Sequence, residues 1–88
     1  MSNIKFTEDG FEEYLFWQFQ DRKTLKKINK LIQDITRNGP LKGEGNPEAL
    51  KHDYSGLYSR RIDAKNRLVY GFEDGEVVIV KCRGHYKD

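Results

Sequence analysis

The sequence predicts an α+β fold in which a short N-terminal strand and two helices precede a three-stranded antiparallel meander. Three observations predict it. Apolar residues repeat at helical spacing between positions 25 and 35, β-branched and aromatic residues gather between 57 and 83, and an Asp-Gly pair separates the last two β-rich runs. A chain of 88 residues can bury one core but not two, so we expect a single domain over residues 1–88.

The first two elements follow from the N-terminal residues. Residues 3–6 alternate polar and apolar side chains, which is typical of a short strand. Thr7 is a suitable N-cap for a following helix, and the acids Glu8 and Asp9 suit the positive end of that helix. Four apolar residues then lie at helical spacing: Phe11, Tyr14, Leu15 and Phe19.

The second helix has the clearest pattern in the chain. Asp21 is a suitable N-cap, and Asn38-Gly39-Pro40 ends the helix, because glycine tolerates the left-handed cap and proline cannot continue the hydrogen-bond ladder. The apolar residues that repeat at three and four are Leu25, Ile28, Leu31, Ile32 and Ile35. The opposite face carries Lys23, Lys26, Lys27 and Lys30. We interpret that face either as solvated or as a contact with RNA or the ribosome.

The rest of the chain predicts a loop and then strands. Residues 41–56 are rich in glycine and lack a periodic pattern, so we expect a long loop, and a loop of this length in a small domain often carries function. Three β-rich runs follow, at 57–62, 67–73 and 76–83. The second and third runs are joined by Asp74-Gly75, which is a strong two-residue hairpin signal.

Turn geometry predicts which side chains share a face of this sheet. If the last turn has two residues, Val69 lies opposite Val80. If the preceding turn pairs Asp63 with Arg67, then Arg61 lies opposite Val69, and both arginines project from one face. One more residue in either turn would separate the two arginines. The other face is expected to pack on the helices through Ile62, Leu68, Tyr70, Phe72, Val77 and Ile79.

Positive charge is concentrated in the middle of the chain. Residues 1–21 contain one base and five acids (net −4), residues 22–67 contain twelve bases and five acids (net +7), and residues 68–88 contain three bases and four acids (net −1). These values sum to the net charge of +2. The middle region is therefore where we expect a polyanion such as RNA to bind.

Cysteine usage and hydropathy bound the environment of the protein. A single cysteine, Cys82, excludes an internal disulfide and a multi-cysteine zinc site. It ends the run Val77-Val78-Ile79-Val80-Lys81-Cys82, so we expect a buried strand residue and not a nucleophile. The chain shows no hydrophobic leader and no run near the ~20 apolar residues of a membrane span, which favours a cytoplasmic protein without membrane partners.

Several residues outside the helices have the chemistry needed to cut RNA. Cleavage through the 2′-hydroxyl requires a base, an acid and cations that stabilise the charged phosphorane, and it requires no metal or other cofactor. Glu48 in the long loop is the candidate base, and His85 after the last strand is the candidate acid. Arg61 and Arg67 are the candidate clamps, because a guanidinium binds phosphate oxygens bidentately, whereas Lys51 would orient substrate or tune Glu48.

Each of these residues also has a structural interpretation. A loop glutamate is usually solvated, a strand-end histidine is usually a surface or packing residue, and arginines on an exposed sheet face are usually solubilising or ion-paired. Tyr86 by itself would be an aromatic plug. The residue pattern alone therefore favours a basic α+β domain that can bind RNA.

Motifs along the whole chain add a family resemblance. They are Tyr14-Leu15-Phe16-Trp17-Gln18, Lys26-Lys27-Ile28-Asn29-Lys30-Leu31-Ile32, Pro47-Glu48-Ala49-Leu50-Lys51-His52, Ser55-Gly56-Leu57-Tyr58-Ser59-Arg60-Arg61-Ile62, Arg67-Leu68-Val69-Tyr70 and His85-Tyr86. Together they closely resemble the YoeB branch of the RelE and ParE toxin superfamily. The resemblance implies a microbial-ribonuclease-like fold with two helices on an antiparallel sheet. It also implies a homodimer that cuts mRNA at the ribosome and is neutralised by a YefM-type antitoxin.

The resemblance assigns a role to each candidate residue. The family's general base falls on Glu48, its general acid on His85, its phosphate-binding arginines on Arg61 and Arg67, its further basic residue on Lys51 and its terminal tyrosine, which helps to position substrate, on Tyr86. Two departures accompany this match. Ala49 stands where a proline often follows the family's catalytic glutamate, and Lys87-Asp88 extend beyond the point where members commonly end.

Two other functions remain open from the sequence. The first is a toxin of the same fold that inhibits without cutting RNA, as the gyrase-directed ParE branch does, and such a toxin has no need for both Glu48 and His85. The second is a module that only binds nucleic acid or blocks the ribosome through the +7 region. Binding of that kind is expected to depend strongly on salt and to be insensitive to Glu48→Gln.

Overall fold

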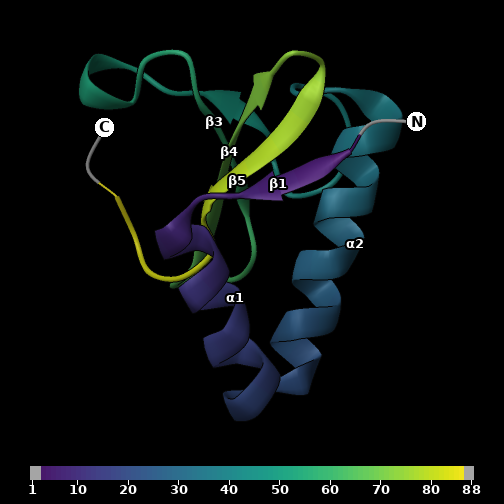
Figure 1. Cartoon of the computed structure of the whole chain (residues 1–88), viewed down its shortest axis with the longest axis vertical. Coiled ribbons are helices and arrows are strands. Elements are labelled where there is room, and N and C mark those ends of the chain that lie inside the picture. The colour runs from purple at the N-terminus through teal and green to yellow at the C-terminus, as the bar shows by residue number, and fades with distance from the viewer. Residues whose placement is uncertain (1–2, 87–88) are drawn as a thin grey trace.

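A computed structural model describes residues 3–86, so the predicted Lys87-Asp88 extension lies outside the described residues. The elements are β1 (Ile4–Phe6), α1 (Glu8–Gln20), α2 (Arg22–Asn38), β2 (Glu48–Ala49), the 3-10 helix η1 (His52–Tyr54), β3 (Tyr58–Arg61), β4 (Arg67–Glu73) and β5 (Glu76–Lys81). The strands form one sheet in the order β1-β5-β4-β3-β2 (Figure 1). This arrangement confirms the predicted α+β class.

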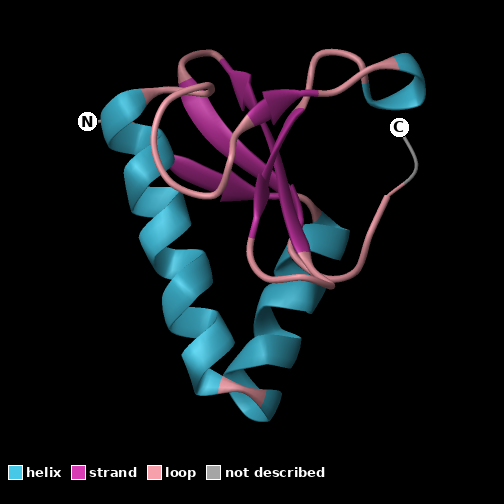
Figure 2. Ribbon diagram, turned by 180° about the vertical axis from the view of Figure 1, so that it is seen from behind, coloured by secondary structure: helices cyan, strands magenta, loops and turns pink. Residues whose placement is uncertain are grey.

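Both helices begin at the predicted caps. The Thr7 hydroxyl accepts a hydrogen bond from the Gly10 N–H (3.0 Å), and the Asp21 carboxylate accepts from the N–H groups of Lys23 (3.1 Å) and Thr24 (3.3 Å). These bonds satisfy donors that have no partner within the helix. Figure 2 shows the helices meeting in a V that opens toward the sheet. Neither helix of residues 3–86 is long and apolar enough to cross a membrane.

The helices contribute unequally to the core. As predicted, α2 buries Ile28, Leu31, Ile32 and Ile35. The apolar positions predicted for α1 are less buried. Phe19 is 84% exposed and Phe11 is 49% exposed. The buried aromatic residue of α1 is Trp17, whose indole N–H donates to the Cys82 carbonyl oxygen (2.8 Å). Trp17 therefore ties α1 to the end of the sheet.

The sheet face that packs on the helices is largely the predicted one. Its buried members are Ile62, Leu68, Tyr70, Val77 and Ile79. Phe72 lies on the same face by alternation with Tyr70, as predicted, but it is only partly covered, with 42% of its surface exposed. Phe72 lies beside the β4–β5 turn, where its ring contacts Tyr58 and Tyr70 with centroid separations of 6.1 and 6.5 Å and leaves one side open to solvent.

The pairing of the strands differs from the predicted registers in two places. Tyr70 lies opposite Ile79 as a two-residue turn requires, but the register then shifts by one, so that Val69 lies opposite Lys81 and not opposite Val80. Between β3 and β4, Arg61 lies opposite Arg67 and not opposite Val69. That second difference is two residues, which preserves the alternation of faces. Arg61 and Arg67 therefore share a face, as predicted.

Two short strands extend the predicted meander to five strands. β1 pairs with β5 in parallel, which makes the sheet mixed. The segment 41–56, for which the sequence predicts only loop, contains β2, which pairs with β3, and then η1. A strand of two residues is too short to produce a visible alternation in the sequence, so a periodic pattern could not reveal it.

A buried arginine organises the chain between α2 and β2. Arg60 is fully buried and forms an ion pair with Asp34. Its guanidinium also donates to three carbonyl oxygens, those of Gly39 (2.9 Å), Lys42 (2.7 Å) and Glu44 (2.9 Å). Because a loop has no ladder partners for these carbonyls, Arg60 supplies their hydrogen bonds and fixes the path that leads to β2.

The thiol of Cys82 is buried, as the sequence predicts. It has no exposed surface, and its burial, followed by the nearby Glu13 charge, raises the pKa of the thiol to about 12. At pH 8 the thiolate fraction is then roughly a thousandfold below that of an ordinary thiol. We expect an aromatic disulfide reagent to label native protein only as fast as the fold opens, and urea-unfolded protein at once. Immediate labelling of the native protein would contradict this burial.

Candidate active site

Arg61 and Arg67 lie side by side at the end of the β3–β4 hairpin. Arg61 is the last residue of β3 and its direct partner Arg67 is the first of β4. Arg67 Nη1 donates to the carbonyl oxygens of Asp63 (2.7 Å) and Asn66 (3.1 Å), which orients its guanidinium. In the part of the chain that the structure describes, neither guanidinium forms an ion pair with a carboxylate. Both charges can therefore bind a phosphate.

The turn that supports Arg67 is closed by hydrogen bonds. The Asp63 carboxylate accepts from the N–H groups of Lys65 and Asn66, both at 2.8 Å. Burial acts to raise the pKa of Asp63, but these bonds and those from the Asn66 side chain outweigh it, so its pKa lies below its usual value. Asn66 Oδ1 in turn accepts from the Gly84 N–H (2.8 Å). One turn therefore supports Arg67 and the chain that leads to His85.

Glu48 is placed by the pairing of β2 with β3. It is exposed and lies opposite Ser59, which is buried. The Tyr86 hydroxyl lies 2.5 Å from Ser59 Oγ and donates a long hydrogen bond to Glu48 Oε1 (3.4 Å). The Tyr86 ring packs on Tyr54 with a centroid separation of 5.5 Å. Two residues far from the C-terminus therefore hold Tyr86 beside the Glu48 carboxylate.

His85 is exposed and lies at the turn that joins β3 to β4. Its Nε2 is 3.4 Å from the Ala64 carbonyl oxygen, in the turn that also supports Arg67. The chain after β5, yellow in Figure 1, passes this turn and then continues toward η1. Its path brings His85 to the turn that supports Arg67 and the following Tyr86 to Glu48.

Lys51 lies in the loop three residues after Glu48. It is exposed and precedes η1, and its carbonyl oxygen accepts from the Tyr54 N–H (3.0 Å). The residue before it, Leu50, is 5% exposed and donates its N–H to the Leu57 carbonyl oxygen (2.9 Å). Leu50 therefore anchors the loop, which leaves the Lys51 side chain at the surface.

Together these contacts place most of the predicted residues on the sheet face opposite the helices. Ser59 and Arg61 alternate with the core-facing Arg60, so they project away from the core, and Glu48 lies opposite Ser59. A carboxylate that can accept a proton and two cations are thus distributed along one exposed face, and the imidazole of His85, which can donate a proton, lies at the turn next to Arg67. That is the set of groups that RNA cleavage through the 2′-hydroxyl requires.

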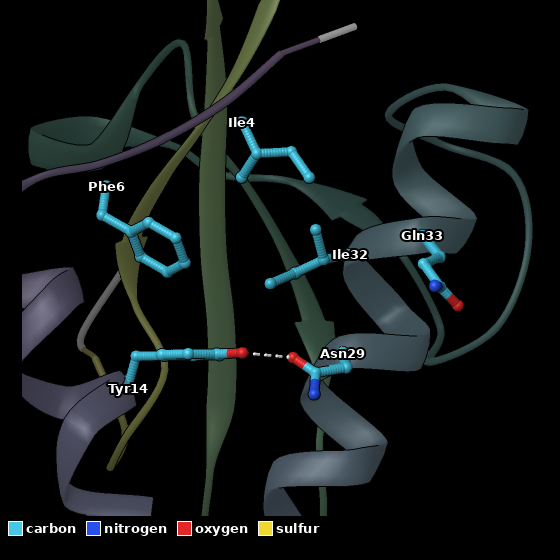
Figure 3. A pocket seen from close by; sticks show the side chains of 6 residues that line it. All are labelled: Ile4, Phe6, Tyr14, Asn29, Ile32 and Gln33. Atoms are coloured by element: carbon cyan, nitrogen blue, oxygen red, sulfur yellow. Dashed lines mark hydrogen bonds between the residues drawn. The ribbon is translucent and has the colours of Figure 1, made fainter. Parts of the chain in front are cut away.

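Another concave surface of the molecule lies elsewhere. It is a groove between β1 and the helices, lined by Ile4, Phe6, Tyr14, Asn29, Ile32 and Gln33, and none of the predicted site residues lines it (Figure 3). The Tyr14 hydroxyl donates to Asn29 Oδ1 (2.7 Å) across its floor. Within residues 3–86, no group of three or more His, Cys, Asp or Glu side chains is placed to hold a metal ion.

Sequence reasoning missed the residues that support the site. Ser59 could have been found, since alternation along β3 places it on the same face as Arg61. Arg60 carried a signal too, because the same alternation turns this charged residue toward the core, where it needs a partner. The contact between Tyr54 and Tyr86 joins segments 32 residues apart, and no local pattern predicts it.

Solved structures that share this fold include toxins from toxin–antitoxin pairs. The chain superposes on a YoeB–YefM complex from Staphylococcus aureus with a TM-score of 0.90 and 45% identity, covering 98% of this chain and 99% of that one. It also superposes on a YoeB dimer from the same organism with a TM-score of 0.90 and 47% identity, covering 97% and 98% of the two chains. The fold is therefore that of this class of toxin.

Sequence comparison identifies the family. Toxin YoeB from Streptomyces coelicolor (strain ATCC BAA-471 / A3(2) / M145) is 54% identical over 83 residues, which cover 94% of this chain and 98% of that toxin. The family described as YoeB-like toxin of bacterial type II toxin-antitoxin system matches residues 6–86. The chain belongs to this family, which confirms the resemblance that its motifs indicate.

Proposed function

We propose that this toxin is a metal-independent endoribonuclease that cuts mRNA on the ribosome. The observation that carries the proposal is the placement of Glu48 beside the Tyr86 hydroxyl on the face where Arg61 and Arg67 project without carboxylate partners. Two guanidiniums that form no ion pair with a carboxylate and project from the same face as Glu48 are suited to bind a phosphate and to stabilise a charged transition state. The positive charge of residues 22–67 supports binding of mRNA and of the ribosome.

Each residue has one role in the proposed reaction. Glu48 takes the proton of the 2′-hydroxyl, and the 2′-oxygen forms a bond to phosphorus while Arg61 and Arg67 stabilise the added negative charge. The bond from phosphorus to the 5′-oxygen breaks, and His85 donates its proton to that oxygen. Lys51 and Tyr86 orient the substrate around Glu48. The products are a 2′,3′-cyclic phosphate, or the 3′-phosphate formed from it, and a 5′-hydroxyl.

The partners in this proposal follow from the relatives. The Staphylococcus aureus structures are described as a YoeB–YefM complex and as a YoeB dimer. By analogy, a YefM-type antitoxin neutralises this chain, and the free toxin is a homodimer. Its place of action is the cytoplasm, where ribosomes and mRNA meet.

The proposal is tested by mapping RNA ends on programmed ribosomes, with and without a chelator. We expect cuts that resist the chelator and leave a 5′-hydroxyl, and none without ribosomes. Translation that stops while the mRNA stays intact would overturn the proposal and indicate a toxin that only binds. Relaxed DNA accumulating in a gyrase assay, again with intact mRNA, would indicate a gyrase-directed toxin.

A further inference from the structure

The position of His85 depends on the segment that precedes it. β5 ends at Lys81, so residues 82–86 lie beyond the last strand. His85 is itself exposed, and its ring makes a long contact with the Ala64 carbonyl oxygen (3.4 Å). A side chain that has to deliver a proton to one particular oxygen needs firmer placement than such a contact gives. The support must therefore come from contacts made just before His85.

One carboxylate of α1 holds the segment immediately after β5. Glu13 Oε1 accepts hydrogen bonds from the N–H groups of both Cys82 (2.7 Å) and Arg83 (3.0 Å), and Glu13 Oε2 lies 3.5 Å from Lys81 Nζ. The Glu13 side chain is 22% exposed. Hydrogen bonds from backbone N–H groups to a partly buried carboxylate are charge-assisted and are stronger than those to a neutral acceptor.

Neighbouring residues of α1 add two further contacts to the same segment. Trp17 donates its indole N–H to the Cys82 carbonyl oxygen (2.8 Å), and the Arg83 guanidinium lies over the Phe16 ring, 3.6 Å from its centroid. Positions 13, 16 and 17 are one turn apart and so share a face of the helix. This face holds residues 81–83 by their backbone and side chains together.

The chain leaves this anchor toward the candidate active site. Gly84 comes next, and both of its backbone polar groups form hydrogen bonds. Its N–H donates to Asn66 Oδ1 (2.8 Å), and its carbonyl oxygen accepts from the Arg67 N–H (3.1 Å). His85 follows directly. The geometry points to Glu13 as a positioning residue that, through Cys82 and Arg83, sets the place from which His85 donates its proton. This inference rests on the proposed function, in which His85 is the acid.

The chemistry of the leaving group separates positioning of the acid from general support of the fold. In the proposed reaction the 5′-oxygen leaves with a proton from His85. When sulfur replaces that oxygen, the bond from phosphorus to sulfur breaks and a thiolate departs without needing a proton, since a thiol has a pKa of only about 8.5. A defect that acts through the acid should shrink on the sulfur substrate, and a defect in folding or in binding should not.

The experiment compares both substrates on programmed ribosomes under single-turnover conditions. Glu13→Gln keeps the size of the side chain but removes the charge, and we expect it to cleave the oxygen substrate about 10- to 100-fold more slowly than wild type. On the sulfur substrate, we expect the cleavage rates of Glu13→Gln and of His85→Ala to be less than roughly threefold below the wild-type rate. Glu13→Asp, whose shorter side chain cannot reach both N–H groups, should behave in the same way. Glu12→Gln is the matched control, because Glu12 is exposed on the same helix, and it should cleave both substrates at the wild-type rate.

The outcomes distinguish this inference from the proposed function. Suppose that the sulfur substrate restores the cleavage rate of His85→Ala, but that Glu13→Gln and Glu13→Asp are slowed by the same factor on both substrates or are not slowed on either. Then Glu13 does not position the acid, and only the inference about Glu13 is overturned. If His85→Ala loses as much with sulfur as with oxygen, His85 is not the acid, and the inference falls with that assignment. Equal thermal midpoints for wild type and Glu13→Gln would show that the kinetic loss is not a loss of folded protein.

Discussion

Glu48→Gln is expected to slow mRNA cleavage on programmed ribosomes by about 100- to 10,000-fold, the contribution of a well-placed general base. Glutamine keeps the shape of the side chain and can still accept the hydrogen bond from Tyr86, but its amide cannot take the proton of the 2′-hydroxyl. The measurement is the single-turnover rate at saturating toxin. Because the fold around Glu48 is retained, binding to the ribosome should change little while the chemical step is lost.

Glu44→Gln is the matched control for this loss. Glu44 lies in the same segment and is exposed, and its backbone N–H and carbonyl oxygen form hydrogen bonds with Asp34 and Arg60. The same change from acid to amide should therefore leave cleavage at the wild-type rate. A wild-type rate in Glu48→Gln would remove the base from the mechanism, and equal losses in both variants would mean that the charge of the loop matters and not a base at position 48.

Arg60→Met should lower the free energy of unfolding by about 3–5 kcal/mol, the range seen when one partner of a buried ion pair is removed. The substitution leaves the Asp34 carboxylate without its cation and deprives several loop carbonyls of their donor. It also removes the hydrogen bond from Arg60 Nε to the Tyr70 hydroxyl (3.0 Å). Urea unfolding followed by circular dichroism measures the change.

The neighbouring arginine provides the control for this effect. Arg61→Met makes the same change one residue later, on the exposed face of β3, and should alter the free energy of unfolding by less than about 0.5 kcal/mol. Adding Asp34→Leu to Arg60→Met should recover part of the loss, because the uncompensated charge is then gone. Equal urea midpoints for Arg60→Met and wild type would show that Arg60 does not stabilise the loop in the way the geometry indicates.

The sequence could predict those elements that depend on local chemistry. The α2 helix is amphipathic over its whole length, with Asp21 as its N-cap and Gly39 at its C-terminal end. The pair Asp74-Gly75 strongly favours a tight hairpin turn between β4 and β5. The shared face of Arg61 and Arg67 was predicted because the error in the register of β3 and β4 was an even number of residues. An odd error would have separated them.

The parts that could not be predicted depend on contacts between distant segments. The register shift between Val69 and Tyr70 has no signal in the sequence of β4 itself. The residues around Glu48 are placed by Arg60 and by Tyr86, which come from β3 and from the C-terminal residues. A single sequence shows which residues suit RNA cleavage, but it does not show which others hold them in place.

The two ends of the sheet have a consequence for how the free toxin behaves in solution. β1 has three residues and β2 has two, so neither edge presents a long row of unpaired backbone groups on which another chain could add a strand. Lys5 in the middle of β1 also places a charge there, held by Glu76 at 2.7 Å. A toxin that acts apart from its antitoxin has to stay dispersed at that time, and blunt, charged edges oppose its self-assembly into fibrils or aggregates.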